Sequence, residues 1–128
     1  MRLRSLDHLV LTVASIDRTV AFYVDVLGMT KETFGPQQRI ALSFGDQKIN
    51  VHERGREIEP KSTVPTPGSA DLCFLVDDVN VARETLVAAG LTILDGPVQR
   101  TGATGPILSV YVRDPDGNLI ELSEAMHP

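Results

Sequence analysis

Apolar and polar residues follow one another along this chain in an order that occurs twice. Residues 6–13 are mostly apolar or β-branched, as in a strand, and apolar side chains then recur at helical spacing between residues 16 and 27. The same order begins again at residue 70, with a strand pattern over 70–76 and a helical stripe over 79–89. When the two copies are aligned, His8 coincides with Asp71. We interpret the chain as a duplicated unit.

The expected helices carry start and stop signals at matching places. Ser15 and Asp78 precede the two stripes, and both residue types are strong helix N-caps. Gly28 and Gly90 follow the stripes, where glycine commonly ends a helix. The order of strand, cap, stripe and glycine therefore supports the duplication.

Short strand patterns follow each helix, so that both copies read β-α-β-β-β. The expected strands span residues 30–34, 39–44, 48–53, 92–94, 108–113 and 118–123. Two Pro/Gly-rich stretches interrupt this order: residues 59–68, as a linker, and residues 96–106, as an additional loop in the second copy. We predict one α+β domain over residues 1–128, with repeat one at 5–58 and repeat two at 69–124.

The composition is that of an ordinary globular domain, with 42% hydrophobic and 23% charged residues among 128. A net charge of −5 gives no electrostatic reason to bind nucleic acid. The chain has neither an apolar run of the ~20 residues that cross a bilayer nor a signal-peptide pattern, so we expect no membrane partner and a cytoplasmic location. The single cysteine, Cys73, lies in an apolar run, and we expect it to be a buried hydrophobic side chain.

Successive side chains of a strand point to opposite faces of a sheet, and this alternation sorts the expected strands. One face is apolar and should pack against the helices. The other face carries the side chains able to bind a metal or a polar ligand, which are His8, Asn50, His52, Asp71 and Glu121. Imidazole and carboxylate together suit zinc, nickel, iron or manganese. Taken singly, each is equally consistent with an ordinary surface residue, so the argument for a functional cleft depends on their coincidence.

Two further side chains have open interpretations. Arg100 begins the sequence Arg-Thr-Gly-Ala-Thr-Gly-Pro, which is either a flexible connection or a loop that brings the guanidinium to an anionic substrate group. Tyr111 alternates within an expected strand, and we expect it to pack rather than to react.

Several segments resemble the vicinal oxygen chelate superfamily, which includes glyoxalase I, bleomycin-resistance proteins, fosfomycin-resistance enzymes and extradiol dioxygenases. The resemblance is carried by LDHLVLTV (6–13), AFYVDVLGM (21–29), ADLCFLVDDV (70–79) and DPDGNLIEL (114–122), and it covers nearly the whole chain. FGDQKINVHE (44–53) and GPVQRTGATGPI (96–107) are similar to a glyoxalase-domain branch that includes proteins labelled virulence-associated.

The resemblance implies a fold and a metal site. Two tandem β-α-β-β-β modules would form a U-shaped mixed sheet around a cleft, with the helices on the outer face and a divalent metal ion inside. His8 matches the first-strand ligand and Glu121 the last-strand ligand. Asp71 stands where the family usually has histidine, and Asn50 where glyoxalase I has an acid. A shifted ligand set of His8, His52, Asp71 and Glu121 therefore remains chemically reasonable, with either Asn50 or His52 facing the ion.

The implied activity is that of a metal-dependent lyase or isomerase like lactoylglutathione lyase, acting on a small substrate that chelates through neighbouring oxygens. Glu121 would be the base that moves a proton beside a carbonyl, through an enediolate-type intermediate. Asn50 and Arg100 are the expected substrate-binding residues. The resemblance also implies a homodimer. The alternatives are a metal-free, antibiotic-like small-molecule binding protein of the bleomycin-resistance kind and, ranked lower, an extradiol dioxygenase.

Overall fold

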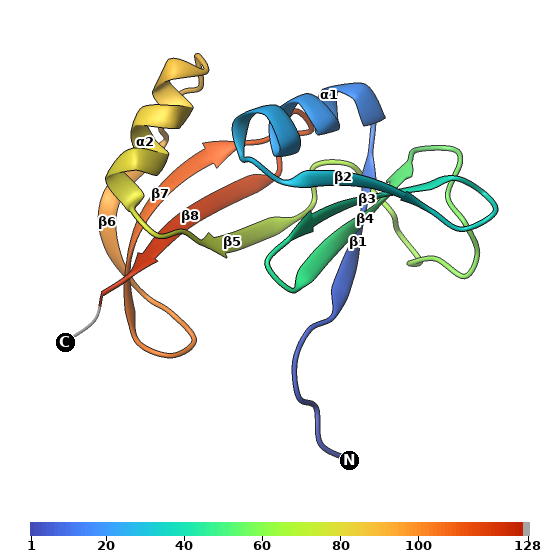
Figure 1. Cartoon of the computed structure of the whole chain (residues 1–128), viewed down its shortest axis with the longest axis horizontal. Coiled ribbons are helices and arrows are strands. Elements are labelled where there is room, and N and C mark those ends of the chain that lie inside the picture. Colours follow the sequence, from blue (N-terminus) through green and yellow to red (C-terminus); the bar gives the residue numbers. More distant parts are fainter. Residues whose placement is uncertain (127–128) are drawn as a thin grey trace. The chain divides into compact units, whose positions relative to one another are not determined.

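The computed structural model describes residues 1–126, which form two compact units, one over Met1–Gly68 and the other from Ser69 onward. In the first unit the elements are β1 (His8–Val13), α1 (Ile16–Val20), the π-helical η1 (Ala21–Val26), β2 (Thr30–Phe34), β3 (Arg39–Phe44) and β4 (Gln47–Glu53). The second unit contains β5 (Asp71–Leu75), α2 (Val79–Ala88), β6 (Asp95–Thr101), β7 (Pro106–Arg113) and β8 (Leu119–Ala125) (Figure 1). None of the helices in this part of the chain is long and apolar enough to cross a membrane.

Each unit holds one four-stranded mixed sheet with the same topology. The strand order is β1-β4-β3-β2 in the first sheet and β5-β8-β7-β6 in the second. In both, the first pair is parallel and the other two pairs are antiparallel. The prediction of an α+β fold built from two tandem β-α-β-β-β modules is confirmed.

The strand register shows which residues of the two units occupy equivalent places. Val10 lies opposite Asn50 on the parallel pair β1–β4, and Cys73 lies opposite Glu121 on β5–β8. On the antiparallel side, Asn50 faces Ala41, whereas Glu121 faces Tyr111. Asn50 is therefore the counterpart of Glu121, and Ala41 that of Tyr111.

The predicted helix caps are present. Ser15 Oγ accepts a hydrogen bond from the Arg18 amide at 3.2 Å, and Asp78 Oδ1 accepts from the amides of Asn80 and Val81 at 2.9 and 3.1 Å. Gly28 and Gly90, which follow the helices, have φ angles of +82° and +81°. This left-handed conformation favours glycine and ends each helix.

The first helix differs from its predicted regular stripe. After Val20 the chain forms the π-helical turn η1, in which the Leu27 amide donates to the Phe22 carbonyl at 3.0 Å. The wider turn places both Phe22 and Tyr23 in the core, whereas a regular helix would turn adjacent residues about 100° apart. A stripe at regular helical spacing does not bury two adjacent residues, so the prediction of this buried face was incomplete.

The prediction for residues 92–106 was wrong in two respects. Residues 92–94 form no strand, and most of the stretch expected to be a loop forms β6 and its hairpin with β7. The reason lies at Gly96, where a Cβ atom would come within 2.1 Å of the Ser109 carbonyl oxygen. Glycine permits this close approach of β6 to β7, and the register shifts there between Asp95 and Val98.

The apolar face of each sheet is buried, as the alternation predicts. In the second unit α2 packs on β7 and β8. The fully buried side chains there include Leu86, Val110, Val112 and Ile120. Cys73 is on the other face and is exposed, which contradicts its prediction as a buried residue. A position inside an apolar run is buried only if its own face of the sheet is covered.

Candidate functional site

A pocket of about 640 Å³ lies on the face of the second sheet that α2 does not cover. The sheet contributes polar side chains to it, and the β6–β7 hairpin forms one wall. Its lining residues include Cys73, Leu75, Arg100, Tyr111, Glu121 and Met126. The pocket therefore brings two residues predicted for the site, Glu121 and Arg100, together with one that was expected only to pack, Tyr111.

Two serine side chains of the same sheet hold the Glu121 carboxylate in the pocket. Its Oε2 accepts hydrogen bonds from Ser109 Oγ at 2.7 Å and from Ser123 Oγ at 3.3 Å. Both serines are fully buried, and their hydroxyls lie 2.6 Å apart. Because these contacts fix one carboxylate oxygen, the other oxygen, Oε1, is the one positioned to take a proton or bind a ligand.

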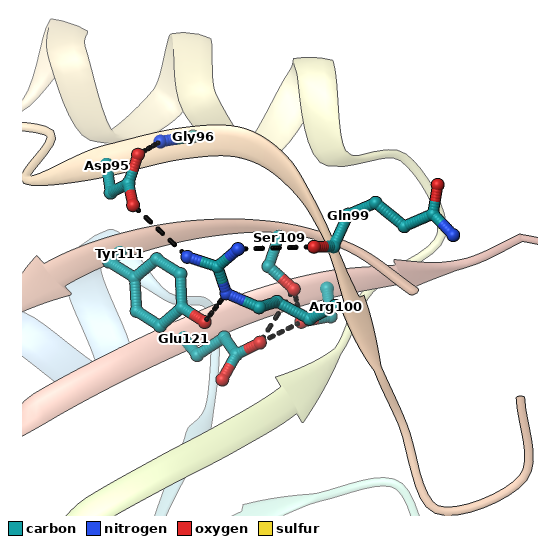
Figure 2. Close-up of polar contacts among 8 residues, drawn as sticks. Asp95, Gly96, Gln99, Arg100, Ser109, Tyr111 and Glu121 are labelled. Atoms are coloured by element: carbon teal, nitrogen blue, oxygen red, sulfur yellow. Dashed lines mark hydrogen bonds and ion pairs between the residues drawn. The ribbon is translucent and has the colours of Figure 1, made fainter. Parts of the chain in front are cut away.

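Arg100 reaches back across the hairpin to Tyr111, as Figure 2 shows. Its Nε donates to the Tyr111 hydroxyl at 3.0 Å, its Nη1 to the Gln99 carbonyl at 3.2 Å and its Nη2 to Asp95 at 3.2 Å. The hydrogen bond to Tyr111 is the main reason that the pKa of Arg100 is raised. With all three nitrogens engaged and Asp95 balancing its charge, the guanidinium acts on the protein's own side chains. Binding of an anionic substrate group by Arg100 stays a prediction.

Tyr111 was expected only to pack, but its hydroxyl lies in the pocket beside Arg100. Burial raises the pKa of its phenol, and the hydrogen bond from Arg100 lowers it in part. The negative charge and the hydrogen-bonding contact of Glu121 add to the increase, so the hydroxyl stays protonated at neutral pH. Tyr111 lies directly opposite Glu121 on the neighbouring strand. Strand alternation within residues 108–113 was the available signal, and the strand pairing that sets Tyr111 opposite Glu121 gives it its meaning.

Cys73 lies opposite Glu121 on the other neighbouring strand, β5. Its Sγ is hydrogen-bonded to Ser123 Oγ at 3.2 Å. Although the residue as a whole is exposed, the sulfur is partly shielded from water within the pocket. This desolvation raises the pKa of the thiol, and the charges of Glu121 and Asp71 raise it further. A thiol with a raised pKa is a poor nucleophile at neutral pH, so this cysteine is not suited to covalent catalysis.

His8 begins β1 in the first unit and is oriented by its neighbour in the chain. Its Nδ1 lies 2.8 Å from Asp7 Oδ1. A carboxylate that accepts a hydrogen bond from Nδ1–H leaves Nε2 as the unprotonated nitrogen of the neutral ring, an arrangement that proteins commonly use for metal-binding histidines. His8 is largely accessible, so that Nε2 can receive a ligand.

Asn50 and His52 lie on the same face of β4 but have different surroundings. Asn50 is only 4% exposed, and its Oδ1 has no hydrogen-bond partner within residues 1–126. His52 Nε2 accepts a hydrogen bond from Arg39 Nη2 at 3.3 Å. Burial and the Arg39 charge lower the pKa of His52, so its ring is neutral and one nitrogen is already occupied. In register, His52 corresponds to the supporting Ser123, and Asn50 to Glu121.

These surroundings test how well the predicted ligands suit a divalent ion. His8, Asn50 and Glu121 each present a donor atom that the fold has oriented or left without a partner, and they fit such an ion. His52 fits poorly because a guanidinium cation lies against its Nε2. Asp71 is exposed at the start of β5, where it lies opposite Leu119. Within residues 1–126, no three His, Cys, Asp or Glu side chains are grouped closely enough to hold a metal ion.

Comparison with known proteins places the chain in a family. Residues 5–122 match the sequence profile of the Glyoxalase/Bleomycin resistance protein/Dioxygenase superfamily. The chain belongs to this superfamily. The resemblance found in the sequence is therefore confirmed, including its narrower part, because a virulence protein is among the similar members of the superfamily.

That member is Virulence protein STM3117 of Salmonella typhimurium, which is 56% identical over 120 residues, covering 93% of this chain and 83% of that protein. Its crystal structure has a TM-score of 0.95 at 54% identity and covers 98% of this chain and 100% of that one. Glyoxalase domain-containing protein RDO1 of Mycosarcoma maydis is also 56% identical, over 96% of this chain and 69% of that protein. A lactoylglutathione lyase of Salmonella typhimurium is 31% identical over 92% of this chain and 90% of that enzyme.

Proposed function

We propose that this protein is a metal-dependent lyase or isomerase that acts on a small substrate with neighbouring oxygens. The observation that carries the proposal is the setting of Glu121, a carboxylate on the floor of a pocket with one oxygen held by two buried serines. A base fixed in this way is positioned to move a proton between adjacent carbon atoms of a bound substrate.

Two serines and Glu121 have different roles in the proposed reaction. Ser109 and Ser123 hold Oε2, so the orientation of Oε1 is set before a substrate arrives. Glu121 removes the proton beside the substrate carbonyl and returns it to the neighbouring carbon. A divalent ion such as zinc, nickel, iron or manganese supplies Lewis-acid stabilisation of the negative oxygen that forms.

For the metal ligands we propose His8, Asn50, Asp71 and Glu121, which stand at equivalent places of the two repeats. The orphaned Oδ1 of Asn50 and the Asp7-oriented ring of His8 support this set. It replaces His52 of the shifted set with Asn50, because the Arg39 guanidinium occupies the His52 ring nitrogen.

The superfamily supports the class of reaction, since a lactoylglutathione lyase is among the relatives. The proposal includes a cytoplasmic homodimer, as the family resemblance implies. An outer strand in each sheet, β2 or β6, has one neighbour only and offers an edge for a second copy.

Metal content tests the proposal most simply. Protein purified without added metal and then reconstituted should bind about one divalent ion per chain, as measured by elemental analysis and calorimetry. His8→Ala and Glu121→Ala should each weaken binding at least about tenfold, because each removes a ligand. Asn50→Ala should do the same.

His52→Ala is the matched control, since it removes a histidine from the same face of β4 and should leave metal affinity within about threefold of wild type. Retention of less than about a tenth of an equivalent, together with no tight uptake on reconstitution, would refute a metal-dependent enzyme. If instead His52→Ala abolishes binding and Asn50→Ala does not, the ligand set is the shifted one.

A further inference from the structure

Two side chains of opposite hydrogen-bonding character stand side by side in the pocket of the second unit. Glu121 is an acceptor, and Tyr111, its direct partner on the neighbouring strand, is a potential donor. Directly opposite residues of an antiparallel pair have Cβ atoms about 5 Å apart, so both can contact neighbouring atoms of one small molecule. Figure 2 shows the two side chains together.

Arg100 determines whether the Tyr111 hydroxyl donates or accepts a hydrogen bond toward a ligand. Its Nε–H donates to the phenolic oxygen at 3.0 Å and occupies a lone pair of that oxygen. The hydroxyl keeps its own proton, which lies within reach of the Glu121 carboxylate in this structure, and a ligand that binds between the two side chains would accept it instead. Because Asp95 and the Gln99 carbonyl hold the other guanidinium nitrogens, this orientation is built into the β6–β7 hairpin. Arg100 is therefore a positioning residue for Tyr111.

Most of the remaining pocket surface is apolar, although Thr101 and Thr104 also line it. Leu75 is 70% exposed and Met126 is 39% exposed, although both are large hydrophobic side chains, and both line the pocket with Ile107 and Ala125. Apolar side chains left in contact with water around a pair of polar groups are typical of a ligand site. They suit a ligand with an apolar body.

The first unit lacks this arrangement. Ala41 stands at the place of Tyr111, and Asn50 at the place of Glu121. The donor and acceptor pair is consequently a feature of the second repeat alone, and duplication of the fold does not account for it.

From this geometry we propose that the pocket binds a small hydroxycarbonyl compound with an apolar substituent. Tyr111 donates a hydrogen bond to its carbonyl oxygen, and Glu121 accepts from the adjacent hydroxyl or carbon-bound hydrogen. This assignment specifies the substrate class of the enzyme proposed above. Its catalytic part depends on that proposed function. Its binding component needs no metal ion.

The proton transfer balances without another reactant. Glu121 takes the proton from the carbon that bears the hydroxyl, and the C–H electron pair becomes a carbon–carbon double bond. The π electrons of the carbonyl move to its oxygen, which becomes negatively charged and accepts the Tyr111 hydrogen bond more strongly. Glu121 then returns the proton to the former carbonyl carbon, and the C=C electron pair forms the new C–H bond. At the same time the substrate hydroxyl passes its proton to the neighbouring negatively charged oxygen, so the carbon that bore the hydroxyl becomes the new carbonyl. Tyr111 remains protonated throughout.

The chain offers a specific spectroscopic probe, because it has two tyrosines and no tryptophan. In protein labelled with 3-fluorotyrosine, one ¹⁹F resonance belongs to Tyr111 and the other to Tyr23, which is fully buried in the first unit. Titration of metal-free protein, in a chelator, with 2-hydroxyacetophenone should shift the Tyr111 resonance and leave the Tyr23 resonance in place. Acetophenone, which lacks the hydroxyl, and hydroxyacetone, which lacks the apolar ring, should each bind at least about tenfold more weakly.

Unlabelled Tyr111→Phe keeps the ring and removes the hydroxyl, so its affinity for 2-hydroxyacetophenone, measured by calorimetry, should fall about tenfold. An unchanged Tyr23 resonance in the labelled variant shows that it is folded. Equal affinity of Tyr111→Phe and wild type, or equal affinity for all three compounds, would overturn the assignment. If the protein takes up no metal but still binds 2-hydroxyacetophenone in chelator, the proposed enzyme is refuted and the ligand pocket is retained. Failure of the proposed function and failure of this assignment are therefore distinguishable.

Discussion

At the scale of single residues, Glu121 and Asn50 occupy equivalent places but are supported differently. Two buried serine hydroxyls hold Glu121, whereas no described partner satisfies the Asn50 oxygen, and Arg39 pairs with the neighbouring His52 instead. Charge and hydrogen bonding thus make one of the two positions a fixed carboxylate. The other presents an unpaired amide oxygen, which is costly unless something binds it.

The thiol of Cys73 reports on the charge of Glu121. Because burial and that carboxylate raise its pKa, alkylation by iodoacetamide should reach half its maximal rate at a higher pH than for an unperturbed thiol. Glu121→Gln removes a negative charge, which should lower the Cys73 pKa and speed the reaction at pH 8. The measurement is direct because the chain has one cysteine.

Asp46→Asn is the matched control for this experiment, since it removes a carboxylate from the first unit. It should leave the rate profile unchanged. A Glu121→Gln protein with the wild-type profile in the presence of chelator would show that the carboxylate does not act on the thiol.

Strand alternation was enough to assign His8 and Glu121 to one face from the sequence, because that rule is local. The same rule placed both Asn50 and His52 on that face of their strand and could not show which of the two is available to a ligand. The contact that separates them joins Arg39 to His52 across two strands, and it depends on the register of β3 against β4. The role of Arg100 in holding Tyr111 was missed for the same reason, since the β6–β7 pairing brings them together.

At the scale of elements, the helix ends were predictable and the irregular segments were not. Caps depend on residues within one turn, which the sequence shows directly. The π-helical turn after Val20 and the bulge at Gly96 are instead set by packing and by the close approach of β6 to β7. Such tertiary contacts have no short-range signal in a single sequence.

The cap of α2 offers a quantitative test of this difference. Asp78→Ala removes the acceptor for the amides of Asn80 and Val81 and should lower the free energy of unfolding by about 1 kcal/mol. Urea denaturation measures the change. Asp77→Ala, an exposed neighbour, should change it by less than about 0.5 kcal/mol.

A loss as large in Asp77→Ala as in Asp78→Ala would mean that net charge, and not the cap, controls the stability of this helix. The amide of Val79 also donates to Glu124 at 2.9 Å, so β8 contributes to the same helix start. This second acceptor should keep the effect of Asp78→Ala near the middle of the range found for caps.

At the scale of the whole molecule, duplication accounts for the fold, and divergence between the copies accounts for the different side chains at equivalent positions of the two sheets. Both units have one topology and one register, and the superfamily match covers residues 5–122. The sequence therefore sufficed to predict the modules and the family. The substrate is a different matter, because members of a fold family share the scaffold and differ in the side chains that line their pockets. Here those are Tyr111, Arg100 and the apolar wall of the second unit.

The central claim is that Glu121 moves a proton beside a carbonyl, and exchange with solvent deuterium measures that step directly. Metal-loaded wild-type protein in D₂O should incorporate deuterium into 2-hydroxyacetophenone, as followed by ¹H NMR. Glu121→Gln should lower the rate at least about 10²-fold after correction for bound metal, because the amide cannot accept the proton. Exchange by Glu121→Gln at the wild-type rate, or no exchange by wild type above metal ion in buffer, would contradict the account.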